Sequence, residues 1–181
     1  MRQSILRYFI SLLLVSLCIC SATSIFIISG SMKEDSEREM MYSVKLIEYN
    51  LDYSKDLNTQ IETLNPLAFS DDTRISIIDE KGKVLADTYK NDISSNHLKR
   101  EEVQQALHSS NHEGYAMRRS ETTNQPLLYA AYYKDTHIIR LSIPYSGVWG
   151  YFPELAPAFA ISILISILFS YIVARKLSKR V

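Results

Sequence analysis

The sequence predicts an α+β fold in which one mixed domain lies between two transmembrane helices. Residues 8–29 and residues 155–173 form uncharged, largely apolar runs of 22 and 19 residues. Each run is long enough to cross the roughly 30 Å core of a bilayer as a helix. Between them, an apolar stripe with helical spacing is followed by five short strand patterns. The expected domain is therefore a long N-terminal helix packed on a five-stranded antiparallel sheet.

The first apolar run, residues 8–29, is preceded by Arg2 and Arg7, as in the basic and apolar regions of a secretory signal. The run is longer than the roughly 7–15 residues usual for a cleaved signal. We therefore expect an uncleaved signal anchor, with residues 1–7 in the cytoplasm. Cleavage by a signal peptidase within residues 21–24 is the alternative.

Both cysteines of the chain, Cys18 and Cys20, lie within the first apolar run. The domain between the two runs therefore has no thiol, which excludes a disulfide framework there. Leu17 and Ile19 precede the cysteines, whereas a lipoprotein signal needs a small residue at that position. We expect both cysteines to be ordinary membrane-helix residues rather than lipid anchors.

Basic residues flank the two apolar runs on their outer sides, and four of them follow the second run: Arg175, Lys176, Lys179 and Arg180. Because cytoplasmic flanks carry the Lys and Arg excess, we expect a two-span cell-membrane protein with both termini in the cytoplasm. The expected segments are transmembrane helices at 8–29 and 152–174, an extracytoplasmic domain at 30–148 and a cytoplasmic linker at 175–181. Residues 31–147 contain 14 basic and 19 acidic side chains, a net charge of −5, which gives no footprint for nucleic acid.

The first element of the domain is predicted to be a helix of about 30 residues that continues the first span. Residues recur on it at intervals of three and four, the period of one helical face: Met40, Val44, Ile47, Leu51, Ser54, Leu57, Ile61 and Leu64. Pro66 is expected to end this helix. Two interpretations are open, and both can hold at different turns of the helix. The stripe packs on its own domain, or part of it pairs with a second copy in a homodimer, with Met40, Val44, Ile47 and Leu51 as the dimer and signalling helix.

The rest of the domain is predicted to be mostly strands. Residues 74–79 and 84–88 form a hairpin around a turn in which Gly82 takes a positive φ. A helix is expected at 98–108, with Val103, Ala106 and Leu107 on its inner face. Three more strands are expected at 114–120, 127–134 and 137–144, with loops at 89–96 and 121–125 and a tight connection at 135–136. This order is that of PAS-like and Cache-like sensory domains, which pack one sheet face on the long helix and leave a pocket on the other.

Several motifs of the domain occur in the order found in one known family: residues 74–79, 82–88, 96–98, 102–107 and 128–131, with Gly114, Arg118 and Ser120. The domain resembles the extracytoplasmic sensor of phosphate-regulon-type bacterial sensor histidine kinases. Residues 174–180 resemble the entry of the HAMP linker that follows the second span in such kinases. The resemblance implies a sensory half that acts through a cytoplasmic kinase module and a response regulator.

Two departures from this family stand out. The turn at residues 121–126 lacks the expected glycine. The 181 residues also contain neither a phospho-accepting histidine on a dimerisation helix nor an ATP-lid glycine box. We therefore expect the kinase core to be absent from this chain.

Arg118, Arg119 and Arg140 are the arginines of the later strands, and Tyr129 and Tyr132 lie on the strand between them. These five residues are candidate ligand-binding residues, because guanidinium groups match the geometry of carboxylate and phosphate. The alternative is that basic and aromatic residues simply cover a half-exposed sheet.

Histidine spacing and catalytic motifs give no further site. His108 and His112 are four residues apart, beside Glu113, which is a metal-ligand spacing on a helix. Residues 109–111 are expected to end the helix between them, so no metal is predicted. His97 is expected to position the helix that follows it. The sequence has no Gly-x-Ser-x-Gly motif and no phosphate-binding glycine loop, so no catalytic residue and no cofactor are predicted.

The first hypothesis is transmembrane signal sensing and transmission, as the input part of a two-component sensor histidine kinase. A second hypothesis is a stand-alone two-span accessory protein that binds a separate kinase or envelope partner. A third is the input half of a chemoreceptor or cyclase. The coding sequence beyond Val181 would separate them. The stimulus is not specified by the sequence.

Overall fold

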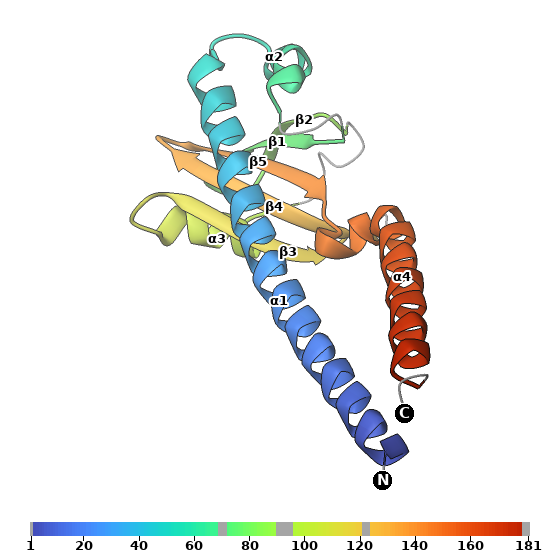
Figure 1. Cartoon of the computed structure of the whole chain (residues 1–181). Coiled ribbons are helices and arrows are strands. Elements are labelled where there is room, and N and C mark those ends of the chain that lie inside the picture. The colour runs from blue at the N-terminus through green and yellow to red at the C-terminus, as the bar shows by residue number, and fades with distance from the viewer. Residues whose placement is uncertain (1, 69–71, 90–95, 121–123, 179–181) are drawn as a thin grey trace. The chain divides into compact units, whose positions relative to one another are not determined.

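The computed structural model describes residues 2–68, 72–89, 96–120 and 124–178 (Figure 1). The chain divides into two units, Met1–Ser146 and Gly147–Val181, and each is described by itself. The first unit contains a long helix and the mixed domain. The second contains one short 3-10 turn and one helix.

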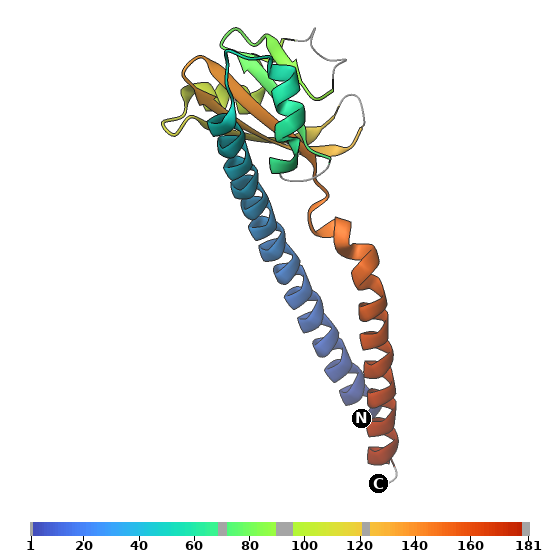
Figure 2. The same ribbon diagram turned by 90° about the horizontal axis from the view of Figure 1, so that it is seen from above.

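Helix α1, Arg2–Asn50, is continuous over 49 residues. Its first part presents exposed apolar side chains such as Leu17 and Phe26, whereas Met40, Val44 and Ile47 near its end are fully buried. Figure 2 shows the N-terminal part of α1 leaving the sheet as a single extended helix. The same helix is therefore apolar on its surface at one end and part of a protein core at the other.

The predicted helix through to Pro66 is wrong, because α1 ends at Asn50. Asp52 accepts hydrogen bonds from the backbone N–H and the hydroxyl of Ser54, at 3.1 and 2.6 Å. Such side chains compete with the backbone for its hydrogen bonds and favour turns over helix. The hydrogen bonds from Ser54, together with Lys55, lower the pKa of the exposed Asp52 carboxyl to about 2.

A separate helix, α2 at Leu57–Leu64, follows this turn. Asp56 caps its N-terminus by accepting from the Thr59 backbone N–H at 2.8 Å, which satisfies one of the free donors at a helix start. Pro66 lies in the 3-10 helix η1, Asn65–Leu67, where the missing N–H of a proline in the first turn costs nothing. Ile61 of α2 is buried in the same core as the end of α1.

The described residues form one five-stranded antiparallel sheet in the order β2-β1-β5-β4-β3. Its strands are β1 at Arg74–Asp79, β2 at Val84–Asp87, β3 at Glu113–Arg119, β4 at Pro126–Lys134 and β5 at His137–Pro144. The predicted hairpin is confirmed, with Gly82 at φ +82°. The β4–β5 connection is tight, with Asp135 at φ +54°. The predicted loop at 89–96 and turn at 121–125 lie largely outside the described residues.

Helices cover both faces of this sheet. Helices α1 and α2 pack on one face over an apolar cluster that includes Ile75, Ile77, Leu128, Ile139 and Leu141. Helix α3, Glu101–His108, packs on the other face through Val103 and Ala106, and Figure 1 shows it across the sheet from α1. It begins at Glu101 rather than at Leu98 because Leu98 lies in a turn, where its N–H bonds the Asn96 side chain.

The second unit comprises the 3-10 helix η3, Gly147–Tyr151, and helix α4, Phe152–Ser178. Among the described residues, two helical stretches are long and apolar enough to cross a membrane, Val15–Asn50 and Gly147–Phe169. Of the predicted linker at residues 175–181, the backbone is helical to Ser178. An α+β domain with two apolar helices is therefore present, as the sequence predicts.

Candidate functional site

The sheet face beneath α3 gathers polar and charged side chains from all five strands. Side chains of one strand alternate between faces, so Arg118 of β3, Tyr129 of β4, and Arg140 and Ser142 of β5 share a face. The register places Ser76 of β1 beside both Asp87 of β2 and Arg140 of β5. The opposite face is apolar and carries α1. The two faces of the sheet thus have different chemistry.

Glu102, in the first turn of α3, is the central anion of this face, and its side chain is fully buried. Arg118 binds it in a bidentate pair, with Nη1 and Nη2 at 2.6 and 2.9 Å from the two carboxylate oxygens. Arg140 Nη1 lies 3.7 Å from the same carboxylate. One carboxylate therefore faces two guanidinium groups, and it also fastens α3 to β3.

Arg140 itself is 3% exposed. Its Nη1 donates to His97 Nδ1 at 2.8 Å. A guanidinium can only donate, so His97 Nδ1 accepts and the ring proton lies on Nε2. The Nε of Arg140 is buried and has no hydrogen-bond partner among the described residues.

The charges in this cluster perturb one another. Burial alone would raise the pKa of the Glu102 carboxyl, but the hydrogen bonds and charge of Arg118, with the charge of Arg140, hold that pKa below its usual value. Burial also opposes the charge of Arg118, yet its bond to Glu102 raises the Arg118 pKa. For Arg140, burial lowers the pKa, and the charge of Glu102 offsets this only in part. The Glu102 carboxylate therefore outweighs the effect of burial on the pKa of Arg118 but not on the pKa of Arg140.

A second charged pair lies on the same face. Arg74 binds Asp87 in a bidentate pair, with contacts from Nε and Nη2 at 2.9 Å each. The Ser76 hydroxyl donates to the same carboxylate at 2.8 Å. The Tyr89 backbone N–H donates to Asp87 Oδ1 at 2.7 Å, so both carboxylate oxygens are engaged by groups other than Arg140.

The Tyr129 ring lies against both central guanidinium groups. The Arg118 guanidinium carbon is 3.7 Å from the ring centroid, and that of Arg140 is 5.3 Å from it. A cation over an aromatic face is attracted by the ring quadrupole, most strongly where water is excluded. Tyr129 thus holds the two guanidinium groups side by side.

Three of the five residues predicted from the sequence meet at this cluster, namely Arg118, Tyr129 and Arg140. The other two do not: Arg119 donates to the Asn124 carbonyl at 3.0 Å, and the ring of Tyr132 faces α1, where Lys45 lies 5.2 Å from its centroid. Whether the three residues that meet bind a ligand stays a prediction.

Sequence reasoning missed Glu102 and Asp87 in the cluster and described His97 only as a helix-positioning residue. The His97 backbone N–H does bond the Gly82 carbonyl at 2.8 Å, while its ring serves Arg140. His108 Nδ1 lies 2.8 Å from the Gln104 carbonyl, and His112 packs edge-on against Tyr133. The described residues contain no group of three or more potential metal ligands.

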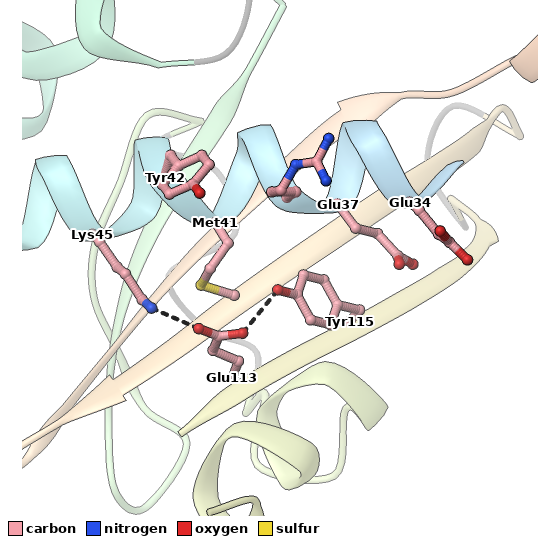
Figure 3. Close-up of a pocket in the computed structure, with 8 residues that line it drawn as sticks. Glu34, Glu37, Met41, Tyr42, Lys45, Glu113 and Tyr115 are labelled. Atoms are coloured by element: carbon pink, nitrogen blue, oxygen red, sulfur yellow. Dashed lines mark hydrogen bonds and ion pairs between the residues drawn. The ribbon is translucent and has the colours of Figure 1, made fainter. Parts of the chain in front are cut away.

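A pocket of about 340 Å³ lies between α1 and β3 (Figure 3). In Figure 3 Lys45 reaches Glu113, whose other carboxylate oxygen meets the Tyr115 hydroxyl. These contacts measure 2.6 and 3.0 Å. Burial and the neighbouring Glu113 raise the pKa of Tyr115 above its usual value. The cations of this pocket have carboxylate partners already, since Arg38 pairs with Asp35, so its main effect is to tether α1 to β3.

The four residues predicted as a dimer and signalling helix lie at the end of α1. Met40, Val44 and Ile47 are buried in the core of their own domain, and Leu51 packs at its edge. This arrangement is the first of the two interpretations that the sequence left open. Any contact between copies would therefore have to use the other side of α1, and dimerisation itself stays a prediction.

No protein-family model matches the sequence, and no curated protein matches it significantly. Among solved structures, the ligand-binding domain of the Campylobacter jejuni chemoreceptor Tlp3 with L-valine is similar over 72% of this chain and 61% of its own, at 19% identity and a TM-score of 0.49. The Bacillus subtilis YkuI protein, which has an EAL domain, is similar over 74% of this chain and 37% of its own, at 17% identity and a TM-score of 0.49.

The chain thus spans less than two thirds of the length of each of these structures. Because both identities lie below 20% and both TM-scores below 0.5, we draw nothing about function from the similarities.

Proposed function

We propose that the chain senses and transmits a signal across a membrane, as the sensory input part of a two-component sensor histidine kinase. The observation that carries the proposal is the continuity of α1. One unbroken helix, Arg2–Asn50, contains an apolar stretch suited to a bilayer and ends in the core of the sheet domain. Because a helix is stiff along its axis, a displacement of its buried end is passed to the end in the membrane.

The proposed topology follows the charges that flank the apolar helices. Arg2 and Arg7 precede the first helix, and the basic residues at 175–180 follow the second. The positive-inside rule then puts both termini in the cytoplasm and residues 31–147 outside. The segment 175–181 would connect to a HAMP-like linker and, through it, to a kinase module.

The contacts between sheet and helix support transmission from one face to the other. Glu113 of β3 pairs with Lys45 of α1 at 2.6 Å, and Lys134 of β4 pairs with Glu48 of α1 at 2.8 Å. The same two strands carry Arg118 and Tyr129 on the charged face. A shift of β3 or β4 caused by binding on that face would thus displace α1 through these two ion pairs.

We place the proposed homodimer contact on the outer side of α1. Tyr42, Leu46 and Tyr49 are exposed, at 67%, 46% and 82%, and they follow one another at intervals of four and three, the spacing of a coiled-coil seam. Ile25, Ile28 and Met32 lie in phase with this row, and the acidic Asp35 and Glu39 occupy the positions between the two parts. A second copy aligned in the same membrane would cover the apolar part on either side of these two carboxylates.

Disulfide crosslinking in membranes tests the dimer contact. With Cys18 and Cys20 replaced by serine, we expect Leu46→Cys and Tyr49→Cys to crosslink between copies. Val44→Cys, buried on the opposite side, is the control and should stay uncrosslinked. Crosslinking of Val44→Cys alone, or of none of the three, would refute this dimer surface.

A chimera tests signal transmission. Residues 1–181 are joined to the HAMP and kinase segments of a histidine kinase, and autophosphorylation is measured in membranes. Inserting one alanine after Gly30 rotates one end of α1 relative to the other by about 100° about the helix axis. Inserting seven alanines changes this relative rotation by only about 20°. We expect the single insertion to change autophosphorylation at least threefold and the seven-residue insertion to change it less. Equal activity in all three chimeras would contradict the lever role of α1 and favour the stand-alone accessory protein.

A further inference from the structure

The charged face beneath α3 has more cationic than anionic groups. Among the described residues it contains three guanidinium groups, those of Arg74, Arg118 and Arg140, and two carboxylates, those of Asp87 and Glu102. Arg74 and Arg118 each take one carboxylate in a bidentate pair. Arg140 is left with a 3.7 Å approach to Glu102 and one hydrogen bond to His97. A guanidinium stays protonated in proteins, and within the described part of the chain this buried charge only shares the Glu102 carboxylate with Arg118.

A separate observation concerns the hydrogen bonds of Arg140. Its Nε–H is buried and has no acceptor in the part of the chain that the structure describes. Buried donors are nearly always paired, because an unpaired one loses its bond to water without replacement. Burial also lowers the pKa of Arg140, because it removes water from the charged group. One oxygen of a bound anion would give Arg140 both a negative charge nearby and an acceptor for its Nε–H.

We propose that Arg140 and Arg118 form a binding site for a small anion bearing a carboxylate or phosphate group. A guanidinium group can donate two parallel hydrogen bonds to either group, and the ring of Tyr129 lies against both cations. Arg118 is 27% exposed and so offers the incoming anion its first contact. Glu102 acts as an internal competitor, because it occupies the donors of Arg118 that an external anion would use.

Binding of this anion would act first on β3, β5 and α3. Arg118 and Arg140 belong to the two strands, and Glu102 belongs to α3. An anion that takes over Arg118 releases the ionic contact between α3 and β3. The proposal concerns binding alone, so it can be tested without any signalling readout and stands or fails separately from the proposed function.

The test is thermal unfolding of the full chain in detergent micelles with sodium phosphate, with sodium acetate, and with sodium chloride at equal ionic strength. A ligand at about 100 times its Kd should raise the Tm by roughly 5–10 °C for a chain of this size. A rise with phosphate alone identifies a phosphate group, and a rise with acetate alone a carboxylate. Equal Tm values in all three salts would overturn the proposal.

Two variants and one control assign the effect to this site. Arg140→Met removes the charge but keeps an apolar side chain of similar length. We expect it to keep or raise the Tm without added anion, since a buried charge that only shares its carboxylate partner is lost, and to abolish the anion response. Arg119→Met, on the opposite face, should leave the response unchanged. A full response in Arg140→Met would overturn the proposal.

Glu102→Gln provides a second test of the proposal if Arg140→Met does not fold. It removes the competing carboxylate while keeping the shape of the side chain. We expect the anion to bind at least tenfold more tightly to Glu102→Gln than to the wild type. Equal or weaker binding would show that Glu102 does not compete, and the proposal would then be wrong.

Discussion

Gly114 lies where α3 comes closest to the sheet, and Gly114→Ala should lift the helix from it. A Cβ at this position would meet the Glu102 carbonyl oxygen at 1.9 Å, the Ala106 nitrogen at 2.7 Å and the Gln105 Cβ at 2.9 Å. Two of these atoms belong to the backbone of α3, so no side-chain rotation relieves the contact. The shortest one is about 1.5 Å below the 3.4 Å at which ordinary contacts begin. The helix or the strand must therefore move.

The size of the effect follows from what this movement breaks. Overpacking alone typically costs about 1–3 kcal/mol. Moving α3 outward also lengthens the bidentate contact of Glu102 with Arg118, and breaking a buried pair completely costs about 3–5 kcal/mol. A gain of about 0.4–1 kcal/mol from the stiffer unfolded chain partly offsets these losses. We expect a net destabilisation of about 2–4 kcal/mol, which lowers the Tm by roughly 5–15 °C.

The assay is thermal unfolding of the full chain in detergent micelles, followed by circular dichroism. Gly30→Ala is the matched control, because no described atom lies within 4 Å of a Cβ added at Gly30. That change replaces a helical glycine by the best helix former and should be neutral or stabilising by up to about 1 kcal/mol. If Gly114→Ala unfolds at the same temperature as the wild type, the close packing of α3 on β3 is wrong.

Three further predictions concern capping, acid and the tether of α1. Asp56→Ala removes the N-cap of α2 and should cost about 1 kcal/mol in chemical denaturation; an unchanged unfolding midpoint would mean that Asp56 does not cap. The pKa of Glu102 is lowered by folding, so its contribution is present above the unfolded value of 4.5 and is lost as the pH falls through the folded pKa. Glu102→Gln should therefore show a weaker loss of Tm below about pH 4.5 than the wild type, and identical acid profiles would count against this role. Lys45→Met and Glu113→Gln in a double-mutant cycle should give a coupling energy of about 0.2–1 kcal/mol, as expected for a partly exposed pair; no coupling would argue against the tether.

The sequence predicts the strands well because their signals are local. β5 is predicted at the bounds where it occurs, since its apolar residues alternate and a tight turn precedes it. The end of α1 could not be placed as well. Leu51, Leu57 and Ile61 keep the spacing of one helical face although they lie in a turn and a second helix, because α1 and α2 both pack on the same sheet face. The polar pattern Asp52-x-Ser54 was the local signal of the break.

The candidate site shows what strand patterns can and cannot predict. Arg118 and Arg119 are neighbours on one strand, so alternation alone requires that only one of them reach the charged face. Tyr132 is excluded in the same way, because it is three residues from Tyr129. Glu102 lies on a helix, and its meeting with Arg118 depends on the close approach of α3 at Gly114. The periodicity of the sequence does not predict that contact.

The difference between the two faces of the sheet suggests how the domain divides its work. The face under α1 is apolar, and its burial stabilises the fold through close packing that offers a small polar ligand no partner. The face under α3 combines a smaller apolar cluster, which includes Val103 and Ala106, with buried ion pairs, whose attraction is largely offset by the loss of hydration. An external anion on Arg118 would keep that guanidinium paired, but the released Glu102 carboxylate would need α3 to move and bring it to water. The sensory role proposed above requires these two arrangements of α3 to lie close in free energy, because a weakly bound ligand can shift only such an equilibrium.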